Sequence, residues 1–489
     1  MMKAISRQKT YMSPGMIKAA AFTVVFICAL AGISYSQEKL PEGVEARRKL
    51  TLEECITIAI ENHIPLKIGK KQLELARLRL IETKRNLGPT VTAKLESSSG
   101  KVTSRNYAGA KIALEGKQPI FYGGELVFSV RQAEVNLEVV KTDYERIKNE
   151  LVLQVKKAYY SLDKTKKALV VQRKLCNRTS EFNDIAKAGY GANVISRLEF
   201  LKVSSQYNQI RFQVVSAEED LAMANLLLQQ AMNIDEEVDI VEVEEPKIIT
   251  LDLETCYNLA YLNRPEIKIG QLSSEYFDYE KKIMRARTNW PRVDFLGSYG
   301  KAVEQYVKQD RSPTDDKRGL RPEFYIGTKI SWPFWGNTLD YSITKEKWTP
   351  VVSTVHGTEA MTNTVSFSLF NRLEDISGFQ EANLEYIRSQ DNAKTKRQEI
   401  TLEVKEMFFK YKKSIFLMEV TKSKIEFQAT QVQILEIRSQ LGEAQYSDVI
   451  EEMLKLAEEQ FSYVQIIADY YIAIASLNKA IGIEGYFDI

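Results

Sequence analysis

Residues 50–69, LTLEECITIAIENHIPLKIG, return 201 positions later as LDLETCYNLAYLNRPEIKIG at residues 251–270. Nine of the 20 aligned positions are identical, far above chance: Leu50/Leu251, Leu52/Leu253, Glu53/Glu254, Cys55/Cys256, Ala59/Ala260, Asn62/Asn263, Lys67/Lys268, Ile68/Ile269 and Gly69/Gly270. A match of this length at a fixed offset indicates a tandem duplication. The chain is therefore expected to be one body built from two similar units, residues 50–250 and residues 251–489.

Each unit contains long segments whose apolar residues recur with helical spacing. In unit one, such a segment runs from about Glu125 to Lys187 without a proline, and a returning helix is expected over residues 196–232. A helix of about 60 residues reaches roughly 90 Å, more than the diameter of an ordinary domain, so such rods must pack lengthwise on one another. We expect long helical hairpins over residues 125–232 and residues 372–481.

Other segments alternate apolar and polar residues, which is the period of a β-strand. They predict a β-hairpin over residues 90–117 with a polar loop at about 98–106, strands over residues 293–333, and further strand-like alternation over residues 338–371. Strands with this pattern form either a soluble hairpin with one wet face or a membrane wall with lipid on the apolar side. The strand pattern alone favours the soluble hairpin, although the cluster of Trp332, Phe334 and Trp335 suits a membrane interface.

The N-terminus has the pattern of an export signal. Residues 1–18 carry four basic side chains and no acidic one, and residues 19–33 are an almost unbroken apolar run. About 15 apolar residues fall short of the roughly 20 that a membrane-spanning helix needs. We therefore expect a signal peptide over residues 1–36 and a linker over residues 37–49. No later stretch has 18 consecutive apolar residues, so the mature chain would have to enter a membrane with strands.

Composition argues against several classes of function. The 67 Lys and Arg nearly balance the 65 Asp and Glu, and no basic cluster stands out that would bind nucleic acid. The two histidines, His63 and His356, have no ligand-like spacing, so we expect no enzyme activity, no cofactor and no metal site. Cys55, Cys176 and Cys256 lie too far apart for a disulfide framework, and the first and last are expected to be buried hydrophobes.

Together these segments resemble the TolC family of outer-membrane efflux and secretion channels over residues 50–485. The resemblance rests on the duplicated segments at 50–67 and 251–268, on the strand-to-helix turn QPIFYGGE at 118–125, and on the helix tips GANVISRLEFLK at 191–202 and GEAQYSDVIEEMLKL at 442–456. In the turn, Gly123 and Gly124 can adopt backbone angles forbidden to other residues. The implied fold is mainly α with a β-barrel portion: a barrel of long antiparallel helices joined to transmembrane strands, assembled as a homotrimer.

The resemblance also implies a function and a location. The protein would be a passive exit duct of a tripartite efflux pump or a type I secretion system, set in outer-membrane lipid with its helices in the periplasm. Its partners would be a periplasmic adaptor (membrane fusion) protein and an inner-membrane transporter. The competing hypothesis is a non-channel coiled-coil scaffold of the cell envelope, which predicts a protein extracted without detergent.

The resemblance places an acidic constriction just beyond the second tip, at Asp448 and Glu451. These residues lie one helical turn apart, so threefold symmetry would make two stacked acidic rings that gate the periplasmic end. Carboxylates also sit favourably at an ordinary helix start, and that interpretation stays open. The matching positions in unit one hold Arg197 and Phe200, so an acidic constriction must come from unit two alone.

The helix tips are the docking site for the adaptor if the resemblance holds. The residues concerned are Gly191, Ala192, Asn193 and Val194 in unit one and Gly442, Glu443, Ala444 and Gln445 in unit two. Glycine lets helical hairpins approach a partner closely, but it also simply ends helices. Both interpretations of the tip glycines are open.

The sequence departs from the family in two places. The expected mature chain begins at Gln37 and not at a cysteine, so no lipid anchor is expected. Residues 338–371 hold strand-like alternation where the family would turn into helix. An extra hairpin would raise the family's four strands per chain to six, and a trimeric barrel from 12 strands to 18, with a wider pore. The alternative is a periplasmic side flap, and the sequence does not choose between the two.

Overall fold

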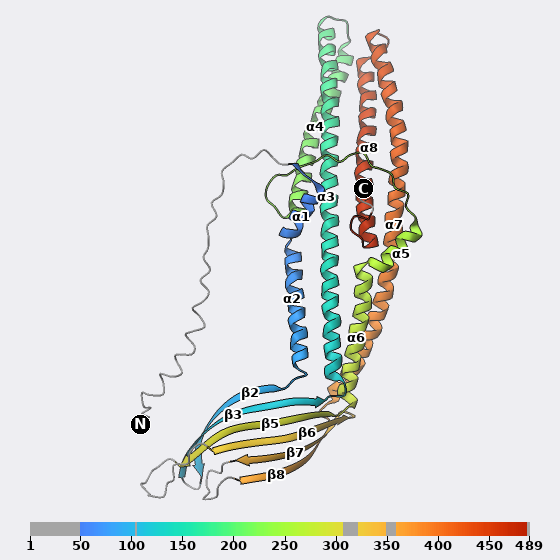
Figure 1. The fold of residues 1–489 in the computed structure, drawn as a ribbon. Coiled ribbons are helices and arrows are strands. Elements are labelled where there is room, and N and C mark those ends of the chain that lie inside the picture. The colour runs from blue at the N-terminus through green and yellow to red at the C-terminus, as the bar shows by residue number, and fades with distance from the viewer. Residues whose placement is uncertain (1–48, 103–104, 307–320, 349–357, 487–489) are drawn as a thin grey trace, which may run out of the picture. The chain divides into compact units, whose positions relative to one another are not determined.

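The computed structural model describes residues 49–102, 105–306, 321–348 and 358–486. The expected signal peptide and residues 37–48 of the expected linker lie outside the described residues. Within Lys49–Ile489, which form one compact unit, long antiparallel helices carry a single large β-sheet at one end (Figure 1). This confirms the expected fold class of long helices combined with strands.

The order of elements repeats between the two units. Unit one contains β1 (Lys49–Leu50), α1 (Leu52–Asn62), α2 (Ile64–Arg85), β2 (Thr90–Val102), β3 (Arg105–Phe121), α3 (Glu125–Gly191), α4 (Arg197–Met232) and β4 (Asp239–Ile240). Unit two contains α5 (Leu253–Asn263), α6 (Pro265–Asn289), β5 (Arg292–Tyr306), β6 (Arg321–Phe334), β7 (Asn337–Trp348), β8 (Thr358–Ser368), α7 (Leu373–Gln440) and α8 (Tyr446–Ile481). Strands β7 and β8 have no counterpart among the described residues of unit one.

Local sequence explains where the duplicated helices begin. At α1, the Glu54 backbone N–H donates to the Thr51 hydroxyl (3.3 Å) while the Thr51 N–H donates to the Glu54 carboxylate (2.9 Å), which is a capping box. At α5, the equivalent Asp252 accepts from the Thr255 N–H at 3.0 Å. The two units therefore start their first helix with related but not identical caps.

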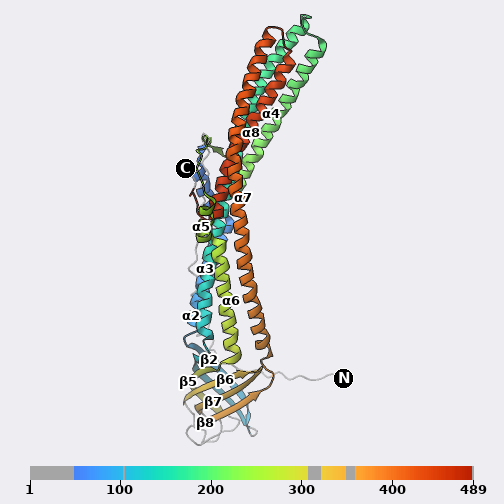
Figure 2. The ribbon, with the colours of Figure 1, turned by 90° about the vertical axis from the view of Figure 1, so that its right-hand side faces the viewer.

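The helices lie side by side as a wall (Figures 1 and 2). Helix α3 packs against α2 and α4 on one side and against α6 and α8 on the other, and α7 packs against α6 and α8. Helices α3 and α7 have 67 and 68 residues, so at 1.5 Å per residue each reaches about 100 Å. The free edges of this wall are formed by α2 and α4 at one side and by α7 at the other. None of the described helices is both long enough and apolar enough to cross a membrane.

Each unit has its own hydrophobic core. Cys55 is buried with Tyr159 and Leu228 in unit one, and Cys256 is buried with Tyr411 in unit two. Both cysteines are free thiols, which confirms the expectation of small buried hydrophobes. A third cluster joins α3, α4, α7 and α8 near their tips, so the two hairpins are packed together at the end far from the sheet.

The segment that links the units, residues 241–250, is fastened across the helices by tyrosine hydroxyls. Tyr159 donates to the Val241 carbonyl at 2.7 Å, Tyr470 donates to the Lys247 carbonyl at 2.7 Å, and Tyr471 donates to the Glu244 carbonyl at 3.0 Å. We call residues 241–250 the strap. Because these residues form no helix or strand, side-chain donors supply partners for their backbone carbonyls.

The sheet has six antiparallel strands in the order β2-β3-β5-β6-β7-β8. Strands β6 and β7 are joined by Trp335 and Gly336, with φ angles of 49° and 76°, as a two-residue type I′ hairpin turn requires. The inserted residues therefore continue the sheet. The expected polar loop at 98–106 is wrong in extent, because β2 reaches Val102 and β3 begins at Arg105. Ser98 pairs with Gly109 there, so strand pairing overrides the local turn-like composition.

Candidate functional site

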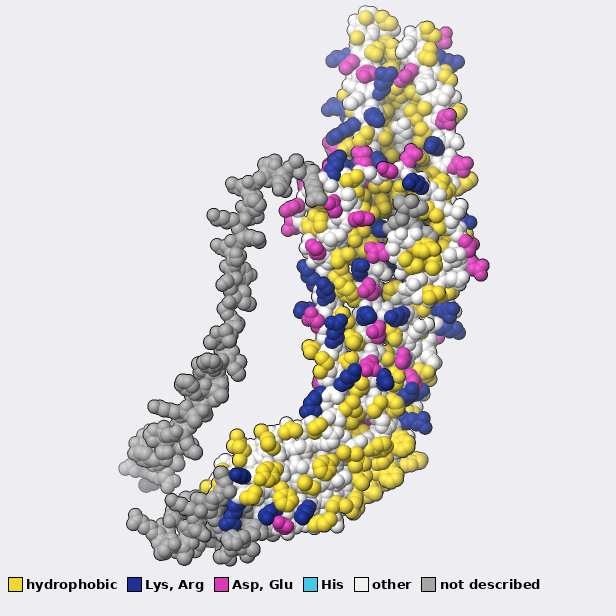
Figure 3. All heavy atoms as spheres, in the orientation of Figure 1, with side chains coloured by type: hydrophobic (Ala, Val, Ile, Leu, Met, Phe, Trp, Pro, Cys, Tyr) yellow, Lys and Arg dark blue, Asp and Glu magenta, His cyan; other side chains and the backbone are white. Residues whose placement is uncertain are grey.

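One face of the six-stranded sheet is apolar and exposed (Figure 3). The register aligns Leu95 with Ile112, Leu114 with Tyr299, and Leu339 with both Trp332 and Phe367. The exposed apolar side chains of this face include Val91, Leu95, Ile112, Leu114, Phe295, Tyr299, Ile326, Trp332, Phe334, Leu339, Tyr341, Ile343, Met361, Val365 and Phe367. An apolar surface that extends over all six strands is far larger than a soluble protein normally leaves in water.

The apolar face has distinct borders. At the end near the helices lie Trp332 and Phe334, and Phe334 stacks on Phe367 at 5.7 Å between ring centroids. At the other end, the same strand faces carry Lys345 and Lys347. The nine residues from Phe324 to Trp332 span about 30 Å along β6, which a tilt of about 40° reduces to roughly 23 Å. That height matches the roughly 25 Å apolar band, flanked by aromatic residues, of outer-membrane barrels.

The opposite face of the sheet is polar and carries several ion pairs. Lys111 lies 3.1 Å from Glu323, Lys117 lies 3.0 Å from Asp294, and Lys329 lies 3.6 Å from Asp340. Small residues allow close packing on this face: a Cβ on Gly300 would come within 2.4 Å of the Ile112 carbonyl oxygen. A sheet with one apolar and one charged face suits a wall between lipid and water.

The turn with Gly123 and Gly124 connects the sheet to the helices. Both glycines have positive φ angles, 62° and 88°, and a Cβ on Gly123 would lie 2.2 Å from the Cβ of Trp290. The next residue, Glu125, is buried and binds Arg287 at 2.7 Å and Arg292 at 3.0 Å. The predicted turn therefore joins unit one to the start of β5 in unit two, at the border between sheet and helices.

The first tip turn follows α3 and contains the four residues expected to dock a partner. Asn193 has a φ angle of 61°, and the Val194 N–H donates back to the Gly189 carbonyl at 2.9 Å, which closes a Schellman-like helix end. Val194 and Leu198 are about 80% exposed (81% and 79%). The tip thus presents apolar side chains, of which the sequence analysis identified Val194 but not Leu198.

The second tip turn follows α7. Gly442 has a φ angle of 80° with no atom near its missing Cβ, and the Glu443 N–H donates to the Arg438 carbonyl at 2.9 Å. Leu441 is exposed beside it. Like the first tip, this turn pairs a backbone reversal with an exposed leucine.

Glu199 connects the two tips. Its carboxylate oxygens accept hydrogen bonds from the backbone N–H and the hydroxyl of Ser447, and both residues are buried. The pattern Ser196-x-x-Glu199 predicts a local capping box, and the Glu199 N–H does donate to the Ser196 hydroxyl at 3.1 Å. The Glu199 side chain instead caps a helix of the other unit, which no sequence pattern indicates.

Asp448 and Glu451 lie on the partly exposed side of the first turns of α8. The Asp448 carboxylate lies 3.6 Å from the Lys202 ammonium of α4, and the Glu451 carboxylate lies 3.7 Å from the Lys455 ammonium. Both carboxylates are about half exposed, at 50% and 55%. Lys455 could have been found from its i,i+4 spacing, whereas Lys202 lies on another helix and gives no sequence signal.

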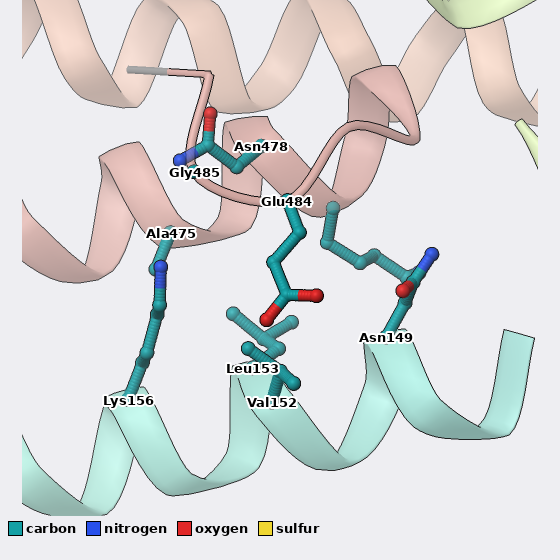
Figure 4. Close-up of a pocket in the computed structure, with 9 residues that line it drawn as sticks. Asn149, Val152, Leu153, Lys156, Ala475, Asn478, Glu484 and Gly485 are labelled. Carbon is teal, nitrogen blue, oxygen red and sulfur yellow. The ribbon is translucent and has the colours of Figure 1, made fainter. Parts of the chain in front are cut away.

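Two hollows of about 430 Å³ and 340 Å³ lie between α3, α6 and α7, and both are lined by charged side chains that include Arg146, Glu266 and Lys396. A cavity of about 20 Å³ lies between α3 and the segment after α8, where Glu484 points towards Val152 and Leu153 (Figure 4). That volume suffices for about one water molecule. Within the described part of the chain, no three His, Cys, Asp or Glu side chains are grouped so as to hold a metal ion.

Comparisons with known proteins agree with this arrangement. Residues 56–233 match the model of the outer membrane efflux protein family. The sequence comparison with curated proteins found no significant match.

Among solved structures, the chain is similar to the CmeC outer membrane channel of Campylobacter jejuni, with 14% identity, a TM-score of 0.72 and coverage of 92% of this chain and 93% of that one. It is similar to the open state of the MtrE outer membrane channel of Neisseria gonorrhoeae, with 14% identity, a TM-score of 0.68 and coverage of 92% and 97%. It also matches a membrane protein from Pseudomonas aeruginosa, with 13% identity, a TM-score of 0.72 and coverage of 92% and 97%. At these identities the likeness shows a shared fold.

Proposed function

Residues 56–233 place this chain in the outer membrane efflux protein family, a family of transport channels, and on that premise we propose that three copies assemble into one passive exit duct. The chain is a protein of the outer membrane whose helices lie in the periplasm. The observation that carries the proposal is the sheet, whose apolar face suits lipid while its polar face suits a water-filled lumen. A coiled-coil scaffold in water would not account for that apolar face.

The outer helices of the wall carry apolar stripes that support assembly with further copies. On α7, the exposed stripe consists of Leu402, Phe409, Phe416, Phe427, Ile434 and Leu441, at intervals of seven or eleven residues. On α4, it consists of Leu198, Leu201, Phe212, Val215, Met223 and Leu226. These intervals keep each stripe on one side of its helix. Both stripes lie opposite the side that packs on the chain itself, so they are available to neighbours.

The two stripes differ from each other, so a contact between them joins unlike surfaces of two copies. Such heterologous contacts close into a ring when the rotation permits. A ring of three copies would enclose a tunnel of helices continuous with the sheets. The free edges of the sheet, β2 and β8, lie next to α2 and α7 in the chain, so the same contact would bring sheet edges together.

The helix tips are the proposed docking site of a periplasmic adaptor, which would connect the duct to an inner-membrane transporter. Exposed Val194, Leu198 and Leu441 support this role, because apolar side chains at an otherwise polar helix end favour a protein partner. The backbone reversals at Asn193 and Gly442 hold these side chains at the extreme end of each hairpin. No chemical step is assigned to this polypeptide, and energy would come from the transporter.

Asp448 and Glu451 are the proposed periplasmic gate. The two residues lie one helical turn apart near the second tip. Three copies would bring six carboxylates around the threefold axis. In one chain, the ammonium groups of Lys202 and Lys455 partly neutralise these two carboxylates, so the net electric field of the gate is weak. The field also depends on how the helices are rotated about their axes, because the rotation sets the distances within the ion pairs. The gate is therefore expected to prefer cations only modestly.

The experiment that tests the duct is planar-bilayer conductance of the full, detergent-extracted protein. Discrete conductance steps, together with a cross-linked trimer in detergent, are expected. Protein recovered in the water-soluble fraction without steps would contradict the duct and favour the scaffold. Val194→Asp should keep the steps and lose adaptor-dependent export, since Val194 belongs to a proposed docking tip and to neither apolar stripe.

A further inference from the structure

We propose that β8, and not β6, closes the membrane wall by pairing with β2 of the next copy, so that the barrel has 18 strands. This inference rests on the proposed trimeric duct. It concerns the inserted hairpin of β7 and β8, for which the sequence left a barrel position and a periplasmic flap equally open.

The edge of β6 is already occupied. It pairs with β7 from Phe324, opposite Lys347, to Phe334, opposite Asn337. Strand β7 pairs in turn with β8 from Thr338, opposite Ser368, to Trp348, opposite Thr358. A 12-stranded barrel would need β6 to give up this continuous ladder in exchange for β2 of another copy. The existing ladder between β6 and β7 is antiparallel and continuous, and a ladder between β6 and β2 of another copy would also be antiparallel. Replacing the first by the second therefore gains no backbone hydrogen bonds.

The inserted hairpin continues both faces of the sheet. On the apolar side, Tyr341 lies between Ile330 of β6 and Val365 of β8. On the polar side, Ser342 lies between Lys329 and Thr364. A flap in the periplasm would be surrounded by water and would have no reason to align its apolar residues with those of the lipid-facing strands. The alignment therefore places β7 and β8 in the same wall.

The exposed fraction of the apolar side chains rises from β7 to the edge strand β8. The side chain of Tyr341 on β7 is 37% exposed, whereas that of Val365 on β8 is 69% exposed. Strand β8 is thus a long, unprotected edge with an apolar face, of the kind that soluble proteins avoid because it pairs with other chains. It is not blocked by proline, since residues 358–368 contain none.

The two free edges have the correct direction and position to meet. Strand β2 leaves α2 and runs away from the helices, while β8 runs towards the helices and leads into α7. A neighbour that places its α2 and α4 edge against α7 therefore brings β2 antiparallel to β8. The helix-proximal end of β8 is fixed, because the Phe370 N–H donates to the Asn337 side chain at 2.9 Å and the Arg372 N–H donates to the Gly336 carbonyl at 3.0 Å.

The consequence is a wider exit. Barrel diameter grows roughly in proportion to strand number, so backbone diameters are about 24 Å for 12 strands and about 36 Å for 18 strands at a tilt of about 40°. The open cross-section at the membrane would increase by about twofold. The duct would then accept bulkier solutes at its outer mouth than a 12-stranded member of the family.

The decisive test is disulfide trapping between copies in the full-length protein. Thr92→Cys in β2 is combined with one substitution in β8, which is Thr362→Cys, Thr364→Cys or Ser366→Cys. In matched variants it is combined with one substitution in β6, which is Tyr325→Cys, Lys329→Cys or Ser331→Cys. All these positions are on the polar face, and three positions per strand allow for the unknown register between copies. Cys176→Ser removes the partly exposed native thiol, while Cys55 and Cys256 are buried. Disulfides form only where the Cβ atoms come within about 4.5 Å.

Covalent trimers from at least one pair of β2 and β8, and none from β2 and β6, are the expected result. Covalent trimers from β2 and β6 would overturn the inference and leave the duct intact. Trimers that conduct but form no disulfide between copies would also overturn the inference and leave the duct intact. Absence of both trimers and conductance would instead overturn the proposed function itself.

A second measurement tests the environment of β8 without relying on a disulfide. A fluorophore on Val365→Cys should be quenched severalfold more by nitroxide-labelled lipid chains than the same fluorophore on Thr364→Cys, because the two residues face opposite sides of the strand. Equal and weak quenching at both positions in conducting protein would place the hairpin outside the membrane and overturn the inference.

Discussion

The carboxylate of Glu199 in unit one accepts two hydrogen bonds from Ser447 in unit two, from its backbone N–H at 2.8 Å and from its hydroxyl at 3.0 Å. The first turn of a helix has N–H groups without intrahelical partners, and here the partner of one comes from the other repeat. The two helical hairpins of one chain are thereby tied together at the end where the proposed duct opens.

Removing the Glu199 carboxylate should loosen the tips. Glu199→Ala leaves the buried Ser447 N–H and hydroxyl without an acceptor, which costs about 1–3 kcal/mol. The amide of Ser447 and its neighbours in α8 should therefore exchange hydrogen at least about fivefold faster, as measured by mass spectrometry of the proposed trimer. Glu419→Ala, at an exposed position of α7, is the control and should leave exchange at the tips unchanged. Unchanged exchange in Glu199→Ala would show that the contact does not hold the tips together.

Substituting Asp448 and substituting Lys202, the two members of the ion pair at the second tip, should change the ion selectivity of the pore in opposite directions. Asp448→Asn removes a negative charge and should lower the cation preference of the pore, whereas Lys202→Met removes the positive charge 3.6 Å away and should raise it. Reversal potentials under a KCl gradient measure both variants. If both shift in the same direction, or neither shifts, the pair does not line the conducting path.

Loss of the Glu125 carboxylate should separate the sheet from the helices. Glu125 is buried between Arg287 and Arg292, so Glu125→Ala leaves two cations without their anion, at a cost of about 3 kcal/mol. The trimer should dissociate at a lower temperature on SDS gels. Glu134→Ala, in an exposed ion pair of the same helix with Lys84 and Arg131, should have little effect. Equal losses in both variants would argue against a special role for the buried site.

The glycine turn between β3 and α3 should be intolerant of any side chain. Gly123→Ala would place a methyl group 2.2 Å from Trp290 at a φ angle of 62°, so we expect a loss of several kcal/mol and little assembled trimer. Gly378→Ala in α7 is the matched control, because its Cβ would lie 3.7 Å from the Met284 sulfur, an ordinary contact. It should be neutral or slightly stabilising. Normal assembly of Gly123→Ala would contradict the close packing of this turn.

The architecture could be predicted from the sequence, because the duplication and the helical spacing that define it are local or periodic features of the sequence. The pairs Cys55/Cys256 and Ala59/Ala260 mark the duplication, and the unbroken apolar spacing marks the long helices. The extent of β2 and β3 could not be predicted, because Ser98 and Gly109 have turn-like composition and are held in strands by their partners.

The contacts at the candidate gate depend on how helices far apart in sequence are rotated against each other. The pattern placed Asp448 and Glu451 on one face of a helix, but nothing in it identifies Lys202 as the partner of Asp448. The same holds for Glu199, whose spacing from Ser196 fits a local cap while its side chain binds Ser447. Distances between such residues are set by core packing of four helices, which short-range patterns do not encode.

The strap should make the protein sensitive to alkali. Burial raises the pKa of Tyr159 to about 12, from about 10 for an unfolded tyrosine. Because the folded pKa is raised, the stability contributed by the neutral hydroxyl is fully present below pH 10 and is lost as the pH rises from 10 to 12. Burial also raises the pKa of Tyr470, which donates to the same strap, so it adds to the loss.

Tyr159→Phe removes the hydrogen bond to the Val241 carbonyl, which should cost about 1 kcal/mol at pH 8. It also removes one ionisable group from the strap, so its melting temperature should fall less between pH 9 and pH 11 than that of the unaltered protein. Calorimetry of the detergent-solubilised trimer at both pH values measures the difference, and Tyr463→Phe, on the same helix as Tyr470 but outside the strap, is the control. Parallel falls in melting temperature for the unaltered protein and Tyr159→Phe would mean that ionisation of Tyr159 does not drive alkaline unfolding.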